Sequence, residues 1–159
     1  MSGAEKLVFG TEQERAKWAW DKVDEVAPRP GTGGRSGAVE KRYGTLARKL
    51  PSYLQVSGVG QTLAFLYAKG KGEGATGTTG AGAKGDGVLL RHLRERVLMV
   101  LANGGAVKAE PRDVMQVVLQ LDPDQYRLET AELAAAATWL KRFAEGRLGE
   151  EEEGAGDAK

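Results

Sequence analysis

The chain has no cysteine and a single histidine, His92, among its 159 residues. Without thiols there is no disulfide framework, no cysteine nucleophile and no sulfur ligand for a metal ion. One histidine also excludes a metal site built from several histidines, and His92 stands between Leu90 and Leu93 in a helical pattern, with no serine close to it in sequence. We therefore interpret His92 as a residue of a helix surface or rim, and we expect no catalytic residue, no cofactor and no metal.

The chain also lacks long apolar runs and period-two alternation. No segment approaches the roughly 18 apolar residues that suggest a membrane span, and the N-terminal stretch contains no apolar core of a signal peptide. No stretch alternates for long enough to predict a β-strand. The sequence therefore predicts an all-α protein that is soluble, unexported and cytoplasmic, which the absence of cysteine also fits.

Glycine, by contrast, is abundant, with 23 residues against an ordinary usage of about 7%. Residues 70–87 contain eight glycines and no large apolar side chain, so nothing there offsets the backbone entropy lost on folding. We expect a flexible insertion at 70–87, a disordered acidic tail at 150–159 and a single helical domain across 1–149.

The spacing of apolar residues predicts about six helices in a compact bundle. The first begins at a capping box formed by Thr11 and Glu14, and Trp18 falls off its apolar face, as a partner contact or a rim residue. The next helix, at 38–50, meets Pro51, which either kinks it or begins a new one.

The remaining helices follow a corner marked by Gly58 and Gly60. Residues 88–102 are apolar over more than half the circumference and predict the most buried helix, and two prolines, Pro111 and Pro123, mark the starts of the last two. The residues expected to face inward are Ala16, Ala19, Trp20, Val23 and Val26 in the first helix, Val39, Tyr43, Leu46, Ala47 and Leu50 in the second, Leu63, Leu66 and Tyr67 after the corner, then Val114, Val117, Val118 and Leu121, and finally Trp139 and Phe143.

The corner resembles a nucleotide site at first sight, because Gly60-Gln61-Thr62 stands where a phosphate-binding loop has Gly-Lys-Thr before its helix. In that alignment Gln55 replaces the first glycine and Gln61 replaces the lysine. The loop also requires a preceding strand, which the sequence does not predict. We interpret residues 57–60 as a tight corner between helices.

Residues 31–37, GTGGRSG, are either a connector, which we favour, or a phosphate contact at a helix start.

The net charge of the whole chain is only +1, but the chain without its acidic tail is clearly basic. Residues 1–149 carry 22 bases and 17 acids, and residues 35–112 alone carry 13 bases and 5 acids. An excess of this size suits a polyanionic partner, with a merely solvated basic surface as the alternative. The bases that share a helical face by spacing are Lys41 with Arg48, Arg42 with Lys49, and Arg91 with Arg94. Such faces suit phosphate backbones, which give affinity without base-specific recognition.

Three segments resemble one family: ERAKWAWDKV, YGTLARKLPSYLQVSGVGQTLAFLYAKG and YRLETAELAAAATWLKRFAEG. They are similar to the small subunit of the type III-B CRISPR effector, the Cmr complex. The resemblance implies a small α-helical protein without enzymatic activity. It implies copies that stack along the backbone filament, beside the backbone and large subunits, and help to form a groove for guide and target RNA. The basic residues carried over by position are Arg48 and Lys49 in ARKLP, Arg127 in YR, and Lys141 and Arg142 in WLKRFAE. The glycine-rich insertion and the acidic tail depart from the family's pattern.

The sequence thus predicts a non-catalytic, RNA-binding subunit of an antiviral complex, with no membrane contact. Its expected nucleic-acid-binding residues are Lys41, Arg42, Arg48, Lys49, Arg91, Arg94, Arg127, Lys141 and Arg142. One alternative is a helical adaptor that binds protein and makes no nucleic-acid contact. Another is a nucleotide-dependent enzyme, for which ATP or GTP should shift the thermal stability; we expect no shift.

Overall fold

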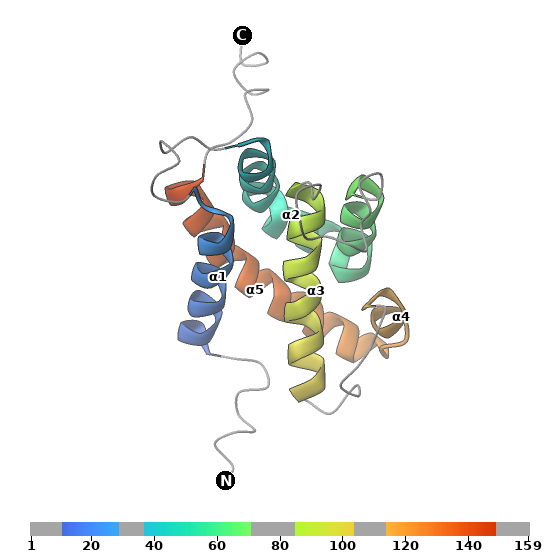
Figure 1. Cartoon of the computed structure of the whole chain (residues 1–159). Helices are drawn as coiled ribbons and strands as arrows, with labels where there is room; N and C mark the ends of the chain where they lie inside the picture. Colours follow the sequence, from blue (N-terminus) through green and yellow to red (C-terminus); the bar gives the residue numbers. More distant parts are fainter. Residues whose placement is uncertain (1–10, 29–36, 71–84, 104–113, 149–159) are drawn as a thin grey trace.

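The computed structural model describes residues 11–28, 37–70, 85–103 and 114–148, and these residues are all-α, as predicted. Their helices are α1 (Glu12–Val26), α2 (Ala38–Gly70), α3 (Gly85–Asn103), α4 (Val114–Leu119) and α5 (Pro123–Arg147). No strand occurs within the described ranges. In Figure 1, α5 crosses behind the other helices, from α4 on one side to α1 on the other.

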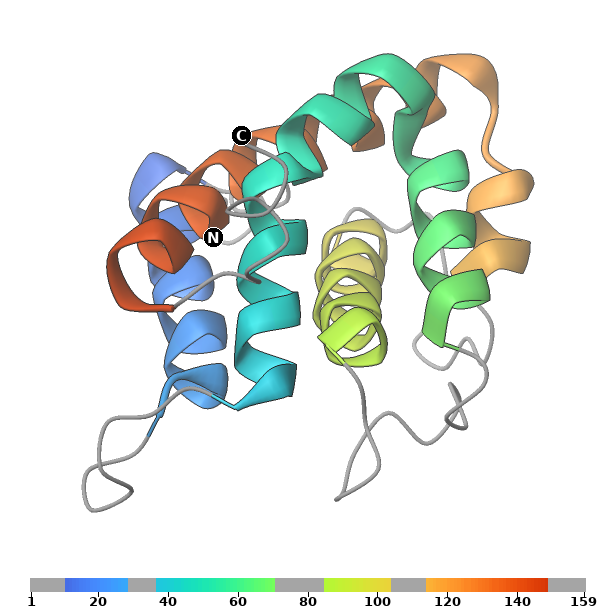
Figure 2. The ribbon, with the colours of Figure 1, turned by 90° about the horizontal axis from the view of Figure 1, so that it is seen from above.

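Helix α2 is a bent element with two limbs, residues 38–57 and 59–70, which meet at Gly58. Gly58 has φ 82° and ψ 171°, a backbone conformation that glycine adopts without steric cost. Pro51 lies inside the first limb and does not end it, whereas the backbone departs from helical angles at the predicted glycine corner. Seen from above, α2 forms an arch with α3 between its limbs, while α1 and α4 lie outside them (Figure 2). Counted by limbs, the helical segments match the predicted number of about six.

The two ends of the insertion predicted at 70–87 are helical. Gly70 is the last residue of α2, and Gly85 to Gly87 already belong to α3. The rest of the predicted insertion, the acidic tail at 150–159, the connector at 31–36 and the helix start at Pro111 lie outside the described residues.

The first helix buries Ala19, Val23 and Val26 as expected, but the positions of two tryptophans were predicted wrongly. Trp18 is 9% exposed and belongs to the core, whereas Trp20 is 47% exposed. The reason is a buried cation: the Arg96 guanidinium lies 5.5 Å from the Trp18 ring centroid and gives the indole a partner inside the bundle.

Two further residues differ from the sequence-based expectation. Tyr67 is exposed, although Leu63 and Leu66 beside it are buried as predicted. His92 is fully buried rather than at a rim, because Tyr43 and Glu25 provide hydrogen-bond partners for both ring nitrogens. The other residues of α3 confirm that this helix is largely interior, since Val88, Leu89, Leu90, Leu93, Val97, Val100 and Leu101 are all buried.

The helix caps are those that the sequence indicates, with one difference. The Glu14 amide donates to Thr11 Oγ1 at 3.1 Å, but the Glu14 carboxylate binds Arg96 instead of completing the capping box. At α5 the box is complete: the Gln125 amide donates to Asp122 at 2.8 Å, and the Asp122 amide donates to the Gln125 side chain at 3.4 Å.

Candidate nucleic-acid interface

The corner of α2 is held by two side chains of α5. The Gly60 amide donates to the Tyr126 hydroxyl at 2.8 Å, and the Val59 amide donates to Thr130 Oγ1 at 3.2 Å. These are the first amides of the second limb, which have no carbonyl partner within their own helix turn. The amides that a phosphate would need are therefore occupied by side chains, which supports the interpretation of residues 57–60 as a structural corner.

Glycine at position 60 is required by the approach of the tyrosine. A Cβ on Gly60 would lie 2.7 Å from the Tyr126 hydroxyl oxygen, closer than carbon and oxygen atoms tolerate. The two sequence pieces that contribute to the family resemblance, SGVGQT and YR followed by Thr130, thus contact each other in the fold.

A buried ion-pair network joins α1, α3 and α5. The Arg96 guanidinium donates to both carboxylate oxygens of Glu14, at 2.7 and 2.8 Å, and to Glu132 at 2.8 Å. Arg15 donates to the same Glu132 at 2.9 and 3.1 Å. Burial alone would lower the pKa of Arg96, but the hydrogen bonds and charges of the two carboxylates raise it above its ordinary value. The network is a structural feature of the core that the sequence pattern did not reveal.

Glu129 lies one helical turn before Glu132 and is also buried. Burial raises its pKa to about 8, and the Glu132 charge adds to that effect while Arg96 opposes it. Neither of its carboxyl oxygens has a hydrogen-bond partner within the described residues. A neutral carboxylic acid is the form that such a site tolerates near pH 7.

His92 is held by Tyr43 and Glu25 in a second buried cluster. The Tyr43 hydroxyl lies 2.7 Å from Nδ1, and Nε2 lies 3.0 Å from the Glu25 carboxylate. Burial lowers the pKa of His92 to about 4, although Glu25 opposes that shift. The ring is therefore neutral at physiological pH, accepting from Tyr43 and donating to Glu25. This arrangement fastens three helices together.

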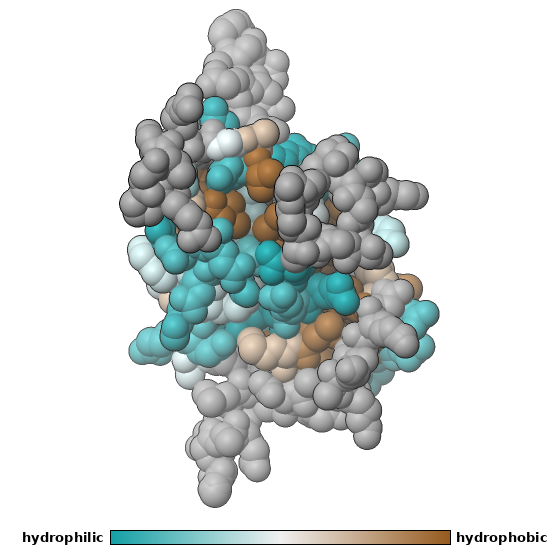
Figure 3. All heavy atoms as spheres, in the orientation of Figure 1, coloured by the Kyte–Doolittle hydropathy of each residue, from teal (hydrophilic) through white to brown (hydrophobic). Residues whose placement is uncertain are grey.

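Several of the predicted RNA-binding residues hold helices together as well. Arg42 makes a two-pronged contact with Asp86 of α3, at 3.0 and 3.1 Å. Arg91 lies 3.7 Å from Glu25 and 3.5 Å from Glu95. Arg94 is half-buried on the same helix. The described part of the face shown in Figure 3 carries a band of hydrophilic residues over α1 and α3, the two helices that Glu25 and Arg91 join.

The remaining predicted residues gather along α5 and the first limb of α2. Arg48 lies 3.5 Å from Glu145 of α5, and Lys141 precedes Glu145 by one helical turn. Lys49 and Arg142 are exposed, and within the described residues neither they nor Lys141 form an ion pair. We call Arg48, Lys49, Lys141 and Arg142 the basic cluster.

Two predicted residues lie apart from this cluster. Lys41 is half-buried, two helical turns before Arg48 on α2. Arg127 is exposed in the first turns of α5, where it pairs with Asp124 at 2.5 Å. It therefore stands about 22 Å along the helix axis from Arg142, at a rise of 1.5 Å per residue.

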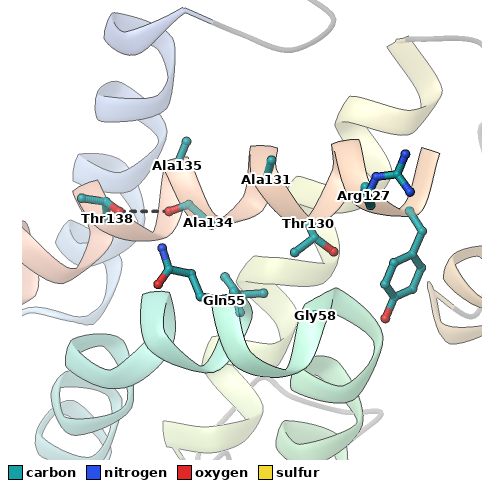
Figure 4. Close-up of a pocket in the computed structure, with 10 residues that line it drawn as sticks. Gln55, Gly58, Arg127, Thr130, Ala131, Ala134, Ala135 and Thr138 are labelled. Carbon is teal, nitrogen blue, oxygen red and sulfur yellow. Dashed lines mark hydrogen bonds between the residues drawn. The ribbon is translucent and has the colours of Figure 1, made fainter. Parts of the chain in front are cut away.

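A groove runs along α5 between these two arginines. One cavity of about 650 Å³ lies between α5 and the bend of α2 and includes Gln55, Arg127 and Ala131. A second, of about 370 Å³, includes Glu12, Trp139 and Arg142. Both are lined by Ala135 and Thr138, so the two cavities adjoin each other along α5, and we call them together the α5 groove. Figure 4 shows the small side chains of α5 along its floor, with Gln55 pointing toward them from α2.

Within the described ranges, no three acidic, histidine or cysteine side chains are placed to hold a metal ion. Among the same residues, no helix combines the length and the apolar character needed to cross a membrane.

The fold and this surface define a small helical protein with a basic face. In a comparison with known families, residues 11–147 match the family described as CRISPR-associated protein (Cas_Cmr5). The chain belongs to this family, which confirms the resemblance to the small subunit of the Cmr effector complex. No curated protein matches the chain.

Proposed function

We propose that this chain is a non-catalytic small subunit of an RNA-guided, RNA-targeting effector complex, which helps to hold guide and target RNA through its basic cluster. Copies of it stack along the backbone filament and contact the backbone and large subunits, in the cytoplasm, as part of antiviral defence. The observation that carries the RNA-binding role is the cluster itself: Arg48 of α2 lies 3.5 Å from Glu145 of α5, Lys141 precedes that carboxylate by one helical turn, and Lys49 and Arg142, their neighbours in the chain, are exposed.

The cluster has the properties of a phosphate-binding surface. Lys49 and Arg142 are exposed and are not neutralised by a carboxylate within the described residues. Their positions on two neighbouring helices fit a contact that follows a phosphate backbone and does not recognise bases. Arg42 and Arg91 contribute less to the proposal, because their charges are engaged by Asp86, Glu25 and Glu95.

The non-catalytic role is supported by the use that the fold makes of its polar residues. The only histidine is fully buried between Tyr43 and Glu25, where it fastens helices and is shielded from any substrate. The amides of the glycine corner are bound by Tyr126 and Thr130 and leave no cradle for a nucleotide phosphate.

The proposal is tested by charge reversal in the assembled complex. A variant with Lys49→Glu and Arg142→Glu should capture target RNA more weakly and show a less steep salt dependence, because each lost phosphate contact lowers the slope of log K against log salt by about 1. A variant with all four cluster residues reversed should show a larger loss. The matched control reverses two exposed lysines elsewhere, Lys17 and Lys69, and should capture RNA normally. Capture unchanged in both cluster variants would refute the assignment of this surface.

A further inference from the structure

Trp139 packs against Phe143 and also lines the smaller cavity of the α5 groove. In α-helices, large side chains lean toward the N-terminus, onto the turn four residues earlier. Phe143 lies over Trp139 in this way, with ring centroids 5.7 Å apart and planes tilted by 33°. By the same preference Trp139 should lean toward position 135, where an alanine is too small to cover the indole. Ala135 and Trp139 both line the smaller cavity, and we call the side of the indole toward this cavity its open face.

The indole is fixed in place on this surface. Its Nε1 donates to Glu12 at 2.7 Å, and Glu12 also accepts from Arg15 at 3.0 Å. The one carboxylate at the rim of this cavity is therefore engaged by two donors. Arg142 lines the same cavity and is exposed. A flat, anchored aromatic ring thus stands beside an available cation.

We propose that the α5 groove binds a short run of single-stranded RNA, with one base stacked on the open face of Trp139 and flanking phosphates on Arg142 and Arg127. This inference rests on the proposed function and adds a mode of contact to it, base stacking at a particular residue. The distance of about 22 Å between the two arginines holds up to about six stacked nucleotides at 3.4 Å each.

The lining of the groove favours a nucleic acid over a protein helix. A helix that docks in a groove inserts large apolar side chains among apolar walls, whereas the floor here consists of alanines and threonines. Gln55 offers an amide that both donates and accepts, and Thr130 retains its hydroxyl hydrogen after accepting from the Val59 amide. Arg142 at one end is exposed, and Arg127 at the other end forms a pair with Asp124 in which both side chains are exposed, so that a phosphate can compete for its guanidinium. Aromatic rings combined with bases are the usual means of binding single strands without sequence preference.

The test uses the purified full-length chain and two probes of equal length, a ten-nucleotide oligouridylate and an abasic ribose-phosphate oligomer. Trp139→Ala should weaken binding of oligouridylate roughly 5- to 150-fold, since one stacked base contributes about 1–3 kcal/mol. Trp139→Phe should retain most of the affinity. The abasic oligomer should bind more weakly than oligouridylate and equally to the wild type and both variants.

Two further variants keep the test decisive if Trp139→Ala perturbs the fold. Ala135→Leu places a larger side chain against the open ring face at a half-buried position and should also weaken oligouridylate binding at least fivefold. Trp20→Ala is the matched control, because that exposed indole packs on Phe143 and Arg147 outside the groove, and it should leave the affinity unchanged.

Three outcomes would contradict the inference. Equal binding of the two probes to the wild-type chain would exclude stacking while leaving the proposed function intact. If Ala135→Leu weakened assembly with other subunits but not oligouridylate binding, the groove would be a protein contact. Binding of neither probe would contradict the proposed function as well.

Discussion

The Tyr126 hydroxyl accepts a hydrogen bond from the Gly60 amide at 2.8 Å, across the contact between α5 and the bend of α2. The bond satisfies an amide that the bend leaves without a helical partner. It also explains why Gly60 has no side chain, since a Cβ would lie 2.7 Å from the same oxygen. The corner and the tyrosine therefore form one unit, although 66 residues separate them in the chain.

Replacing Tyr126 by phenylalanine should destabilise the fold by about 1–2 kcal/mol, because the Gly60 amide loses its partner in a partly buried place. Thermal unfolding should show a decrease in Tm of roughly 2–8 °C. Tyr67→Phe, which removes the hydroxyl of an exposed tyrosine, is the control and should leave Tm unchanged. An unchanged Tm for Tyr126→Phe would mean that water replaces the hydroxyl at no cost.

Gly60→Ala should be costly alone and less costly beside Tyr126→Phe. In the wild type the added methyl meets the hydroxyl oxygen at 2.7 Å, whereas the nearest ring atoms lie 3.6 Å away. A double-mutant cycle of unfolding free energies measures the coupling, which we expect to be about 1 kcal/mol or more. Additive effects of the two substitutions would show that the close approach is relieved by movement elsewhere.

Arg96→Met should destabilise the protein by roughly 3–5 kcal/mol, because Glu14 and Glu132 lose their shared partner and Glu132 is almost fully buried. Urea unfolding followed by circular dichroism measures this loss. Lys17→Ala, which breaks an exposed pair with Asp21, is the control and should change stability by less than about 0.5 kcal/mol. A small effect at Arg96 would contradict the network's role in joining three helices.

Because of Glu129, the free energy of unfolding should decrease as the pH rises above neutrality. The pKa of Glu129 is about 8 in the fold against 4.5 for the free side chain, so the folded state holds a proton that the unfolded state has released. The stabilisation is fully present below pH 4.5 and is lost as the pH rises through about 8. The loss between pH 6 and pH 9 should be on the order of 2–3 kcal/mol in urea unfolding. Glu129→Gln should abolish most of this difference, and an equal pH dependence in wild type and variant would disprove the assignment.

ATP and GTP should not change the Tm of the purified chain, because the corner amides already bind Tyr126 and Thr130. Differential scanning fluorimetry with and without each nucleotide measures this. A rise in Tm at millimolar nucleotide would indicate a phosphate-binding site and would support the alternative of a nucleotide-dependent enzyme.

The helical fold could be predicted from the sequence, because apolar spacing and local caps are short-range properties. The capping box of Asp122 and Gln125 at the start of α5 and the bend of α2 at Gly58 are both predicted by signals of this kind. Trp18 and His92 were assigned wrongly because apolar periodicity does not reveal polar partners inside a core. Arg96 contacts Trp18 there, and Tyr43 and Glu25 contact His92.

The candidate site could be predicted only in part. The family resemblance indicated Arg48, Lys49, Arg127, Lys141 and Arg142. The fold places Arg48 and Lys141 near Glu145 and Arg127 apart from them, in the first turns of α5. Charge spacing also indicated Arg42 and Arg91, but spacing cannot show that Asp86 and Glu25 approach from other helices. The groove has no signal in the sequence, since it depends on how α1, at the Trp139 cavity, and the bend of α2, at the other cavity, lie beside α5.

Crosslinking inside the assembled complex tests the central claim most directly. Target RNA carrying photoreactive uridines is bound by the complex and irradiated, and the crosslinked peptides of this subunit are identified by mass spectrometry. We predict RNA crosslinks in peptides that contain Arg48 and Lys49 of α2 and residues 127–142 of α5. RNA crosslinks in other subunits of the complex, with none in this chain, would contradict the account and favour the protein adaptor.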